Sequence, residues 1–235
     1  MKRIFLRTVI LALICAMLLP GFAFAEKNFS PVNAEDARLQ ALNCLILCAF
    51  DAEYGDPRGY LVRWEDPIYL YIGGNPTAKD IQKVDEMILQ LAYRVPNMPN
   101  IYRTNNEYES NVTMYFVPMD QLGNYVSGYV EGNWGMVTYH YMNSVITSAE
   151  IGIATDVTNQ MQRNHLILEE FINGIGLGND QYEYSDSIVY QPWSEVQQPS
   201  EIDWLMLNMV YSPELKAGMT ADEAWNAMHR KITER

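Results

Sequence analysis

Two adjacent carboxylates and two amides lie at spacings that could place them around one point. Glu169 and Asn173 are four residues apart, so on an α-helix they share one face, and Glu170 lies beside them. Asn179 follows after Gly176, a residue type that can end a helix and turn the chain back. Side chains placed in this way could hold an ion, with Glu170 as a general base that activates water.

These residues resemble the active-site helix of the zincin metalloproteases. The zincin pattern His-Glu-x-x-His-x-x-Gly-x-x-His fits residues 169–179 without a gap. Its three histidine positions hold Glu169, Asn173 and Asn179, and its general-base position holds Glu170. The resemblance implies a protease scaffold that has lost its metal ligands. Because a neutral amide oxygen binds zinc poorly, we predict no cofactor, although the sequence leaves zinc or another divalent metal open.

A displaced metal site is the alternative interpretation. His165 lies one turn before Glu169 on the same helix face, so the pair could hold an ion with Asp180 as a third ligand. Glu170 would then be the catalytic base of an atypical hydrolase. Against this, a single histidine on a helix can simply pack or bond locally, and Asn179 with Asp180 suits an ordinary turn.

A second resemblance follows downstream. Residues 187–190, Ser-Ile-Val-Tyr, are similar to the Ser-x-Met-x-Tyr turn that lies beneath the metal in the metzincin branch of the zincins, with Val189 in place of the methionine. The resemblance adds Ser187 and Tyr190 to the candidate binding residues. The complete set of these candidates is Glu169, Asn173, Asn179, Asp180, Ser187 and Tyr190.

The chain also resembles a bacterial secreted family, domain of unknown function 2927, over residues 60 to 225. The motifs that carry the resemblance are Arg63 to Ile68, Glu169-Glu170, Gly176-Leu177, Asn179-Asp180, Ser187-Ile188 and Leu215 to Met219. One departure is Asn173, where that family usually has glutamine. The family resemblance supports the same zincin-like fold.

The first 25 residues have the pattern of a secretory signal peptide. Lys2, Arg3 and Arg7 precede an apolar core, and the segment ends in Ala23-Phe24-Ala25, a small-residue cleavage site. The apolar run is too short for a stable membrane span. We therefore expect cleavage after Ala25, a secreted or periplasmic location, and one folded domain over residues 26–235.

Charge restricts the partners of the mature chain. The leader holds three of the 16 basic residues and none of the 29 acidic ones, so 13 basic residues remain and the net charge is −16. Such a chain is a poor ligand for nucleic acid or anionic membranes. In the zincin overlay, aromatic residues flank the expected cleft and suit a peptide or a glycan, although tyrosines are also common in strands. These residues are Tyr125, Tyr129, Trp134, Tyr139, Tyr141, Tyr182, Tyr184, Tyr190 and Trp193. Cys44 and Cys48, one helical turn apart, are expected to be buried free thiols, although a bridge stays open. The oligomeric state stays open too.

Capping residues and apolar periodicity predict the remaining elements. We expect an N-terminal helix whose capping box is Asn33 with Asp36, a strand from Tyr60 to Ile72, and a helix that begins at Thr77 and ends before Pro96. Four strands should follow near residues 101–103, 111–117, 134–141 and 145–155, and then helices over 159–175, 200–211 and 220–232. This order predicts a zincin-like α+β domain, in which a twisted mixed sheet with a backing helix lies above the active-site-type helix, and the C-terminal part is helical.

Three functions are compatible with this pattern. The leading hypothesis is an exported, non-catalytic protease homologue that binds a peptide or a glycan in its cleft. The second is a metal-dependent hydrolase or peptidase with Glu170 as its base. The third is a purely structural envelope protein, in which the motif only builds a helix and a turn.

Overall fold

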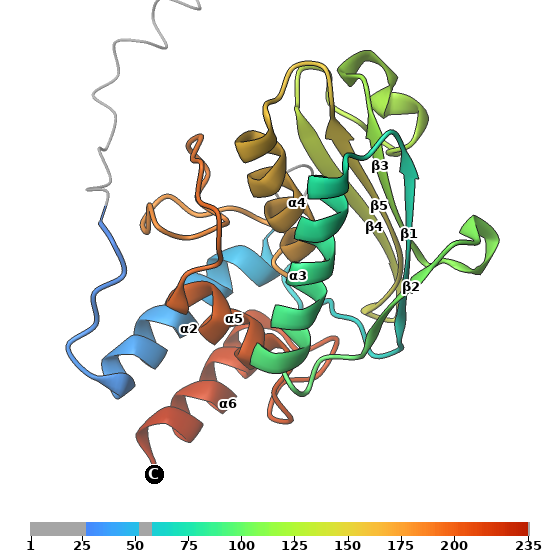
Figure 1. Cartoon of the computed structure of the whole chain (residues 1–235). Helices are drawn as coiled ribbons and strands as arrows, with labels where there is room; N and C mark the ends of the chain where they lie inside the picture. The colour runs from blue at the N-terminus through green and yellow to red at the C-terminus, as the bar shows by residue number, and fades with distance from the viewer. Residues whose placement is uncertain (1–26, 52–57, 235) are drawn as a thin grey trace, which may run out of the picture.

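A sheet backed by helices forms one part of the molecule, and a second group of helices forms the other (Figure 1). The structure is a computed structural model that describes residues 27–51 and 58–234. In chain order the helices and strands are α2 (Ala34–Phe50), β1 (Ile68–Gly74), α3 (Ala78–Arg94), β2 (Ile101–Thr104), β3 (Val112–Val117), β4 (Gly135–Met142), β5 (Val145–Ala154), α4 (Gln160–Gly174), α5 (Glu201–Val210) and α6 (Ala221–Thr233).

The sheet is mixed, with the strand order β2-β1-β3-β5-β4. Strands β2, β1, β3 and β5 run parallel to one another, whereas β4 is antiparallel to β5. Asn143 and Ser144 join β4 to β5 with φ values of 52° and 65°, the left-handed pair that a two-residue hairpin turn requires. The hairpin leaves β4 at the edge of the sheet, with β5 as its partner within the described strands.

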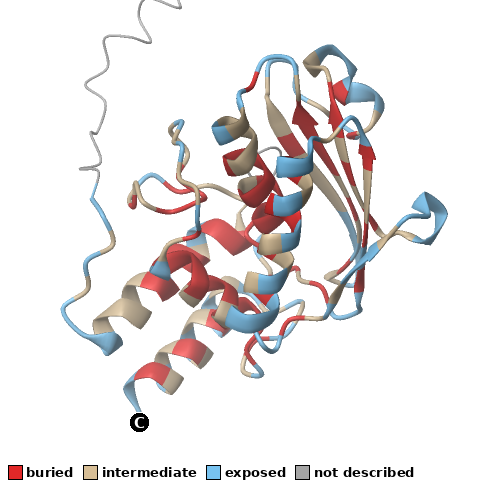
Figure 2. Ribbon diagram, in the orientation of Figure 1, coloured by how far each residue is buried: buried red, intermediate tan, exposed pale blue. Residues whose placement is uncertain are grey.

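Alternation along the strands gives the sheet one apolar face. Ile68, Leu70, Met114 and Phe116 are fully buried on this inner face, which α3 and α4 cover (Figures 1 and 2). Residues of opposite parity, such as Tyr69, lie on the outer face and are partly exposed. The period of two therefore sets which side of the sheet receives the helices.

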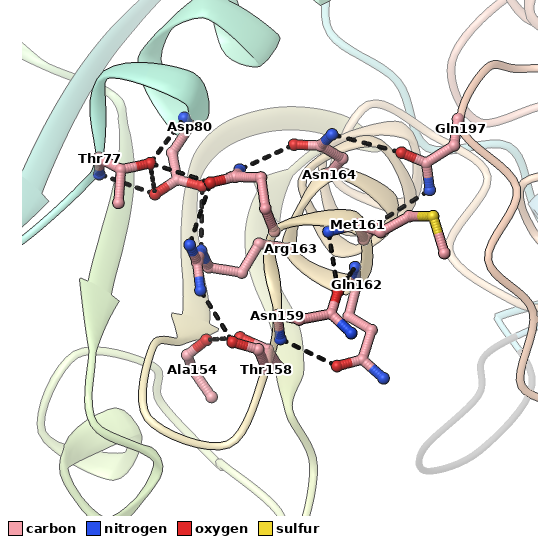
Figure 3. A network of polar contacts seen from close by, with 11 residues as sticks. Thr77, Asp80, Ala154, Thr158, Asn159, Met161, Gln162, Arg163, Asn164 and Gln197 are labelled. Carbon is pink, nitrogen blue, oxygen red and sulfur yellow. Dashed lines mark hydrogen bonds and ion pairs between the residues drawn. The ribbon is translucent and has the colours of Figure 1, made fainter.

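A buried ion pair fixes the N-terminal ends of α3 and α4 to each other (Figure 3). The Asp80 carboxylate accepts hydrogen bonds from Arg163 Nε at 3.0 Å and from Gln160 Nε2 at 2.7 Å, and also caps its own helix at Thr77. Burial alone would raise the pKa of Asp80, but the bonds from Thr77, Gln160 and Arg163 outweigh it and lower that pKa. The network sets the position of α4, the helix that carries the candidate site.

The second part of the molecule is helical. α2 packs against both α5 and α6, and its buried face includes Leu42 and Leu45. Cys44 and Cys48 are buried in the same face, with their sulfurs 3.9 Å apart and unbridged. The prediction of two buried free thiols is confirmed.

Two local predictions are wrong. The expected strand from Tyr60 to Ile72 begins only at Ile68, because the preceding segment enters the core as an irregular chain, with Trp64 buried beneath the end of α4. At the start of α2, Asn33 accepts from two backbone amides as a cap, but the Asp36 carboxylate bonds the amide of Val32 at 2.8 Å. The reciprocal bond of a capping box is absent there.

The fold prediction is otherwise confirmed. The remaining predicted elements all form, and their bounds agree within one or two residues. A mixed sheet, a backing helix and an active-site-type helix beneath the sheet edge have the layout expected of a zincin-like α+β domain (Figure 1). The predicted signal peptide lies outside the described residues. Within the described chain, no helix combines the length and apolar character needed to cross a membrane.

Candidate functional site

The helix that carries the candidate residues has well-defined ends. Asn159 caps the start of α4 through a capping box with Gln162, as its position before an apolar stripe predicts. The helix stops before Gly176, whose φ of 131° is a conformation that other residues rarely adopt. Two carbonyls at this end, which lack helical partners, are bonded by distant residues. Trp64 donates to Gly174 at 3.0 Å, and Tyr211 donates to the next carbonyl at 2.6 Å.

A cleft of about 680 Å³ lies between the edge strand β4 and α4. One wall is formed by residues 132–139, which include the start of β4 and the three residues before it. The other wall is the face of α4 that carries the zincin-like residues. The remaining lining residues are Tyr141 in β4 and residues of the loops after α4 and before β1. The polar and aromatic side chains among the lining residues are Arg58, Trp134, Tyr139, Tyr141, Glu169, Glu170, Asn173, Asp180, Gln191 and Trp193.

Glycines show how closely the two walls approach. A Cβ on Gly135, at the start of β4, would lie 2.7 Å from Glu170 Oε1 and 2.9 Å from the side chain of Leu166. A Cβ on Gly178, after α4, would overlap the Tyr139 hydroxyl. β4 therefore runs alongside α4 in the same direction, with Glu170 near its first residue and the post-helix loop near Tyr139.

The edge of β4 that faces away from β5 offers backbone groups. Trp134 accepts a hydrogen bond from the Ala154 amide at 2.7 Å, and the register continues without a shift to His140. In an antiparallel ladder, bonded pairs alternate with pairs whose backbone groups point outward. We infer that Gly135, Val137 and Tyr139 direct their N–H and C=O groups toward the free edge, where an added strand could bond them.

Glu169 pairs with His165 near one end of the cleft. His165 Nε2 lies 3.5 Å from Glu169 Oε2, and His165 Nδ1 lies 2.9 Å from the carbonyl oxygen of Val196, to which it donates. Burial lowers the pKa of His165. Its ring contacts Trp193 edge-on at 5.6 Å, and Trp193 in turn contacts Trp134. His165 Nε2 therefore lies next to Glu169, and the His165 ring packs against the aromatic wall.

Glu170, Asn173 and Asp180 lie farther along the cleft. Glu170 is 8% exposed and Asn173 is 5% exposed, so both side chains are largely buried. Asn173 Nδ2 donates to Asp180 Oδ1 at 3.3 Å, whereas Asn173 Oδ1 is buried and accepts no hydrogen bond from the residues that the structure describes. A buried acceptor without a donor costs about 1–3 kcal/mol, so this amide is a point at which a ligand donor would gain.

The other sequence candidates lie outside the cleft. Asn179 turns away from Asn173 and donates to the carbonyl of Leu47 in α2 at 3.1 Å. Ser187 is fully buried and donates to Asp203 at 2.6 Å, and Tyr190 is buried in the same turn. The structure therefore brings Glu169, Glu170, Asn173 and Asp180 together, while the turn at 187–190 supports the loop beneath them through the bond from the Gln181 amide to the carbonyl of Val189.

Arg58 is a cleft residue that no motif in the sequence had indicated. Its guanidinium donates to the Asp51 carbonyl at 2.6 Å and lies over the Tyr139 ring, while its buried Nε has no hydrogen-bond partner among the described residues. Burial lowers the pKa of Arg58. The signal that could have identified it is weak, a single arginine after a glycine-proline break, because its role depends on contacts with α2 and β4.

The aromatic residues divide between the cleft and the rest of the fold. Trp134, Tyr139, Tyr141 and Trp193 line the cleft. Tyr125 instead stacks on Tyr115 on the outer face of the sheet, as part of a separate small apolar cluster. The expected aromatic rim is therefore only partly formed by the tyrosines that the sequence suggested.

The donors in the cleft do not fit a zinc ion. The position of the third zincin ligand is occupied by Asn179, which bonds α2, and Asn173 supplies a neutral amide. His165 is 1% exposed and does not line the cleft, so His165, Glu169 and Asp180 do not converge. Across the described residues, no three His, Cys, Asp or Glu side chains are close enough to hold a metal ion.

Comparisons with known proteins identify the family. Two solved structures, "Structure of myroilysin" and "Crystal structure of myroilysin", are each similar at 11% sequence identity, with TM-scores of 0.42 and 0.43. They cover 67% and 80% of this chain and 100% of their own chains. No curated protein matches the sequence. Residues 43–230 match the family described as "Protein of unknown function (DUF2927)". The chain therefore belongs to the DUF2927 family, as its motifs predicted.

Proposed function

We propose that the mature chain is an exported zincin-like domain that binds an extended peptide in the cleft beside β4 and does not cleave it. The observation that carries the proposal is the free edge of β4, which forms one wall of a cleft of about 680 Å³. Export rests on the leader pattern in residues 1–25.

The edge strand favours a peptide over a glycan. A peptide added to β4 would bond the outward groups of Gly135, Val137 and Tyr139, and its alternate side chains would point into the cleft. The rings of Trp134 and Trp193 provide flat contact surface at one end. A glycan could use the rings but not the regular spacing of backbone donors and acceptors along the strand.

The absence of cleavage is proposed from the donor set. A zincin base acts on a water that a metal ion polarises, and the ligand positions here hold Glu169, Asn173 and the diverted Asn179. Without an electrophile beside it, the carboxylate of Glu170 has little power to activate water. Glu170 then contributes charge and hydrogen-bond acceptors to the cleft.

A hydrolase is the second candidate, because Glu170 keeps the place of the general base at the floor of the cleft. If a metal ion were recruited during binding, Glu170 would still lie next to the peptide. Metal content and cleavage therefore have to be measured together with binding.

The experiment uses residues 26–235, purified without chelator, and a library of acetylated and amidated eight-residue peptides. Binding is measured by the change in tryptophan fluorescence, and cleavage by mass spectrometry with and without added zinc, manganese or calcium. The best binder is then resynthesised with N-methyl groups on alternate residues. Methylation in one register should remove binding, and methylation in the other register should leave it unchanged, because only alternate amides face β4.

Four outcomes would contradict the proposal. Equal effects of the two methylation registers would exclude strand addition. Binding of oligosaccharides without any peptide binding would replace the ligand class, and no binding at all would favour the structural role. Metal-dependent cleavage that is lost in Glu170→Gln, with the thermal melting temperature unchanged, would establish the hydrolase instead.

A further inference from the structure

We propose that the floor of the cleft selects a basic side chain, an ammonium or guanidinium group of the bound peptide, through Glu170, Asn173 and Asp180. This inference rests on the proposed peptide binding and adds the chemical identity of one bound residue. The organic cation would occupy the region where the zincin pattern has its metal ligands.

The charge of the lining residues is the first observation. Glu169, Glu170 and Asp180 are the acidic residues that line the cleft, and Arg58 is the basic residue among the described lining residues. With three carboxylates and one guanidinium, the formal charge of the lining is −2. Arg58 lies toward Tyr139 and the loop after α4, where it donates to the carbonyl of Asp51. The part of the cleft near Glu170 is therefore acidic.

The second observation is the buried amide of Asn173. This side chain lines the cleft and is only 5% exposed, and no donor in the described part of the chain bonds its Oδ1 atom. Its Nδ2 is already bonded to Asp180, so the orientation of the amide is fixed with the oxygen as the remaining group. A ligand that complements it must donate a hydrogen bond, which a carboxylate or a plain alkyl group cannot do.

The two observations point to the same ligand chemistry. A carboxylate has about four acceptor sites, so Glu170 and Asp180 can accept a ligand proton in addition to their contacts within the protein. An ammonium group has three N–H donors and a guanidinium has five, which suits acceptors spread over one turn of α4 and the following loop. A bare metal ion would need ligands that converge on one point, and the described residues do not provide them.

The aromatic wall is compatible with a cation. Trp134 and Trp193 lie edge to face, with ring centroids 5.2 Å apart, and both line the cleft. Aromatic faces attract ammonium and guanidinium groups and also pack against the alkyl part of lysine and arginine. A basic side chain that reaches from a strand beside β4 would therefore cross an aromatic wall before it meets the acidic floor.

The test compares acetylated and amidated peptides that differ only at one central residue, which is lysine, arginine, norleucine or glutamate. The dissociation constant of each peptide is measured by isothermal titration calorimetry on residues 26–235. The lysine or arginine peptide should bind at least about tenfold more tightly than the norleucine peptide, because a charged donor gains two or three acceptors. The glutamate peptide should bind most weakly.

Variants then locate the effect. Glu170→Gln and Asn173→Leu should each reduce the preference for lysine over norleucine by about tenfold, while the affinity for norleucine changes less than about twofold. Asn173→Asp should increase the preference. Glu109→Gln is the matched control, since it removes the same charge at an exposed site in the β2–β3 connection outside the cleft, and it should leave the preference unchanged.

The outcomes separate the inference from the proposed function. Equal binding of the lysine and norleucine peptides would overturn the inference and leave peptide binding intact. No binding of any peptide would remove both. Tighter binding of a glucosamine oligosaccharide than of the lysine peptide would show that the cation belongs to a glycan and overturn the peptide source. If a variant fails to fold, the comparison of lysine with norleucine on the unchanged chain still decides the question.

Discussion

Asp203 should make the stability of this protein fall as pH rises from acid to neutral. The residue lies in α5, is 0% exposed, and holds the turn that contains Ser187. Its carboxylate accepts hydrogen bonds from the Ser187 hydroxyl at 2.6 Å, the Ile188 amide at 3.0 Å and the Ser200 amide at 2.7 Å. Burial raises the pKa of Asp203 to about 6, against the opposing effect of these bonds.

The magnitude follows from the difference between the pKa of the folded state, about 6, and the ordinary value of 3.8. At about 1.36 kcal/mol for each pH unit, this difference corresponds to about 3 kcal/mol of unfolding free energy. The folded state binds more protons than the unfolded state between the two values. The contribution of Asp203 is therefore fully present below pH 3.8 and is lost as pH rises through 6, with about 2 kcal/mol of the change between pH 4 and pH 7.

The assay compares Asp203→Asn with the unchanged chain by urea unfolding at pH values from 4 to 7. Asparagine can keep its oxygen on the two amides and turn its NH₂ toward Ser187, so the fold is retained and only the titration is lost. The free energy of unfolding of the variant minus that of the unchanged chain should rise by about 2 kcal/mol over this range. The difference cancels titrations that both proteins share, such as that of His165.

A difference that stays constant with pH within about 0.5 kcal/mol would refute the reasoning, because Asp203 would then not titrate between pH 4 and pH 7. A difference that falls with pH would show that the hydrogen bonds dominate over burial and hold the pKa of Asp203 below its usual value. Asp120→Asn, at an exposed position on a short 3₁₀ helix, is the control and should give no trend.

Three further changes test other parts of the structure. Arg163→Met leaves a buried carboxylate unpaired and should cost about 3–5 kcal/mol in urea unfolding, whereas Arg103→Met, which breaks a more exposed ion pair, should cost less than about 1 kcal/mol. Gly178→Ala places a methyl group against Tyr139 and should weaken peptide binding, whereas Gly123→Ala, whose nearest atom is 3.6 Å away, should not. The two thiols of α2 should react with Ellman's reagent only after denaturant is added, because both are buried.

Local chemistry explains why most elements could be predicted. Asn159, Thr77 and Thr220 each form a capping box with a side chain three residues later, so the start of each helix is encoded within a few residues. The segment at 60–67 lacks such a local code. Its alternation resembles a strand, but the position of Trp64 depends on the hydrogen bond that its indole donates to the Gly174 carbonyl at the end of α4, 110 residues later in the chain. No short window of sequence contains that contact.

The part of the candidate site that lies on α4 could be predicted from the sequence, but the part after the helix could not. Glu169, Glu170 and Asn173 share the cleft because the helical period places them there. Beyond the helix the prediction depends on the exit direction at Gly176 and on the capture of Asn179 by a carbonyl of α2, which together leave Asp180 beside Asn173. Arg58 lies in the site because it contacts the end of α2 and Tyr139 in β4, and no sequence motif marks it.

The two walls of the cleft lie close together, and this closeness affects which ligands the acidic residues can bind. Gly135 lets Glu170 lie against the backbone of β4, and Gly178 lets Tyr139 approach the loop after α4. The charged side chains that line this partly buried cleft interact in a medium less polar than water. Their charges are therefore screened less than charges on an open surface. An anionic group inserted there would lose hydration without gaining a donor, and an apolar group would leave the buried acceptors unbonded, whereas a cation would gain acceptors from α4 and from the loop after it. The region where the zincin pattern has its metal ligands therefore favours positive charge, which we propose is carried by an organic group of the ligand.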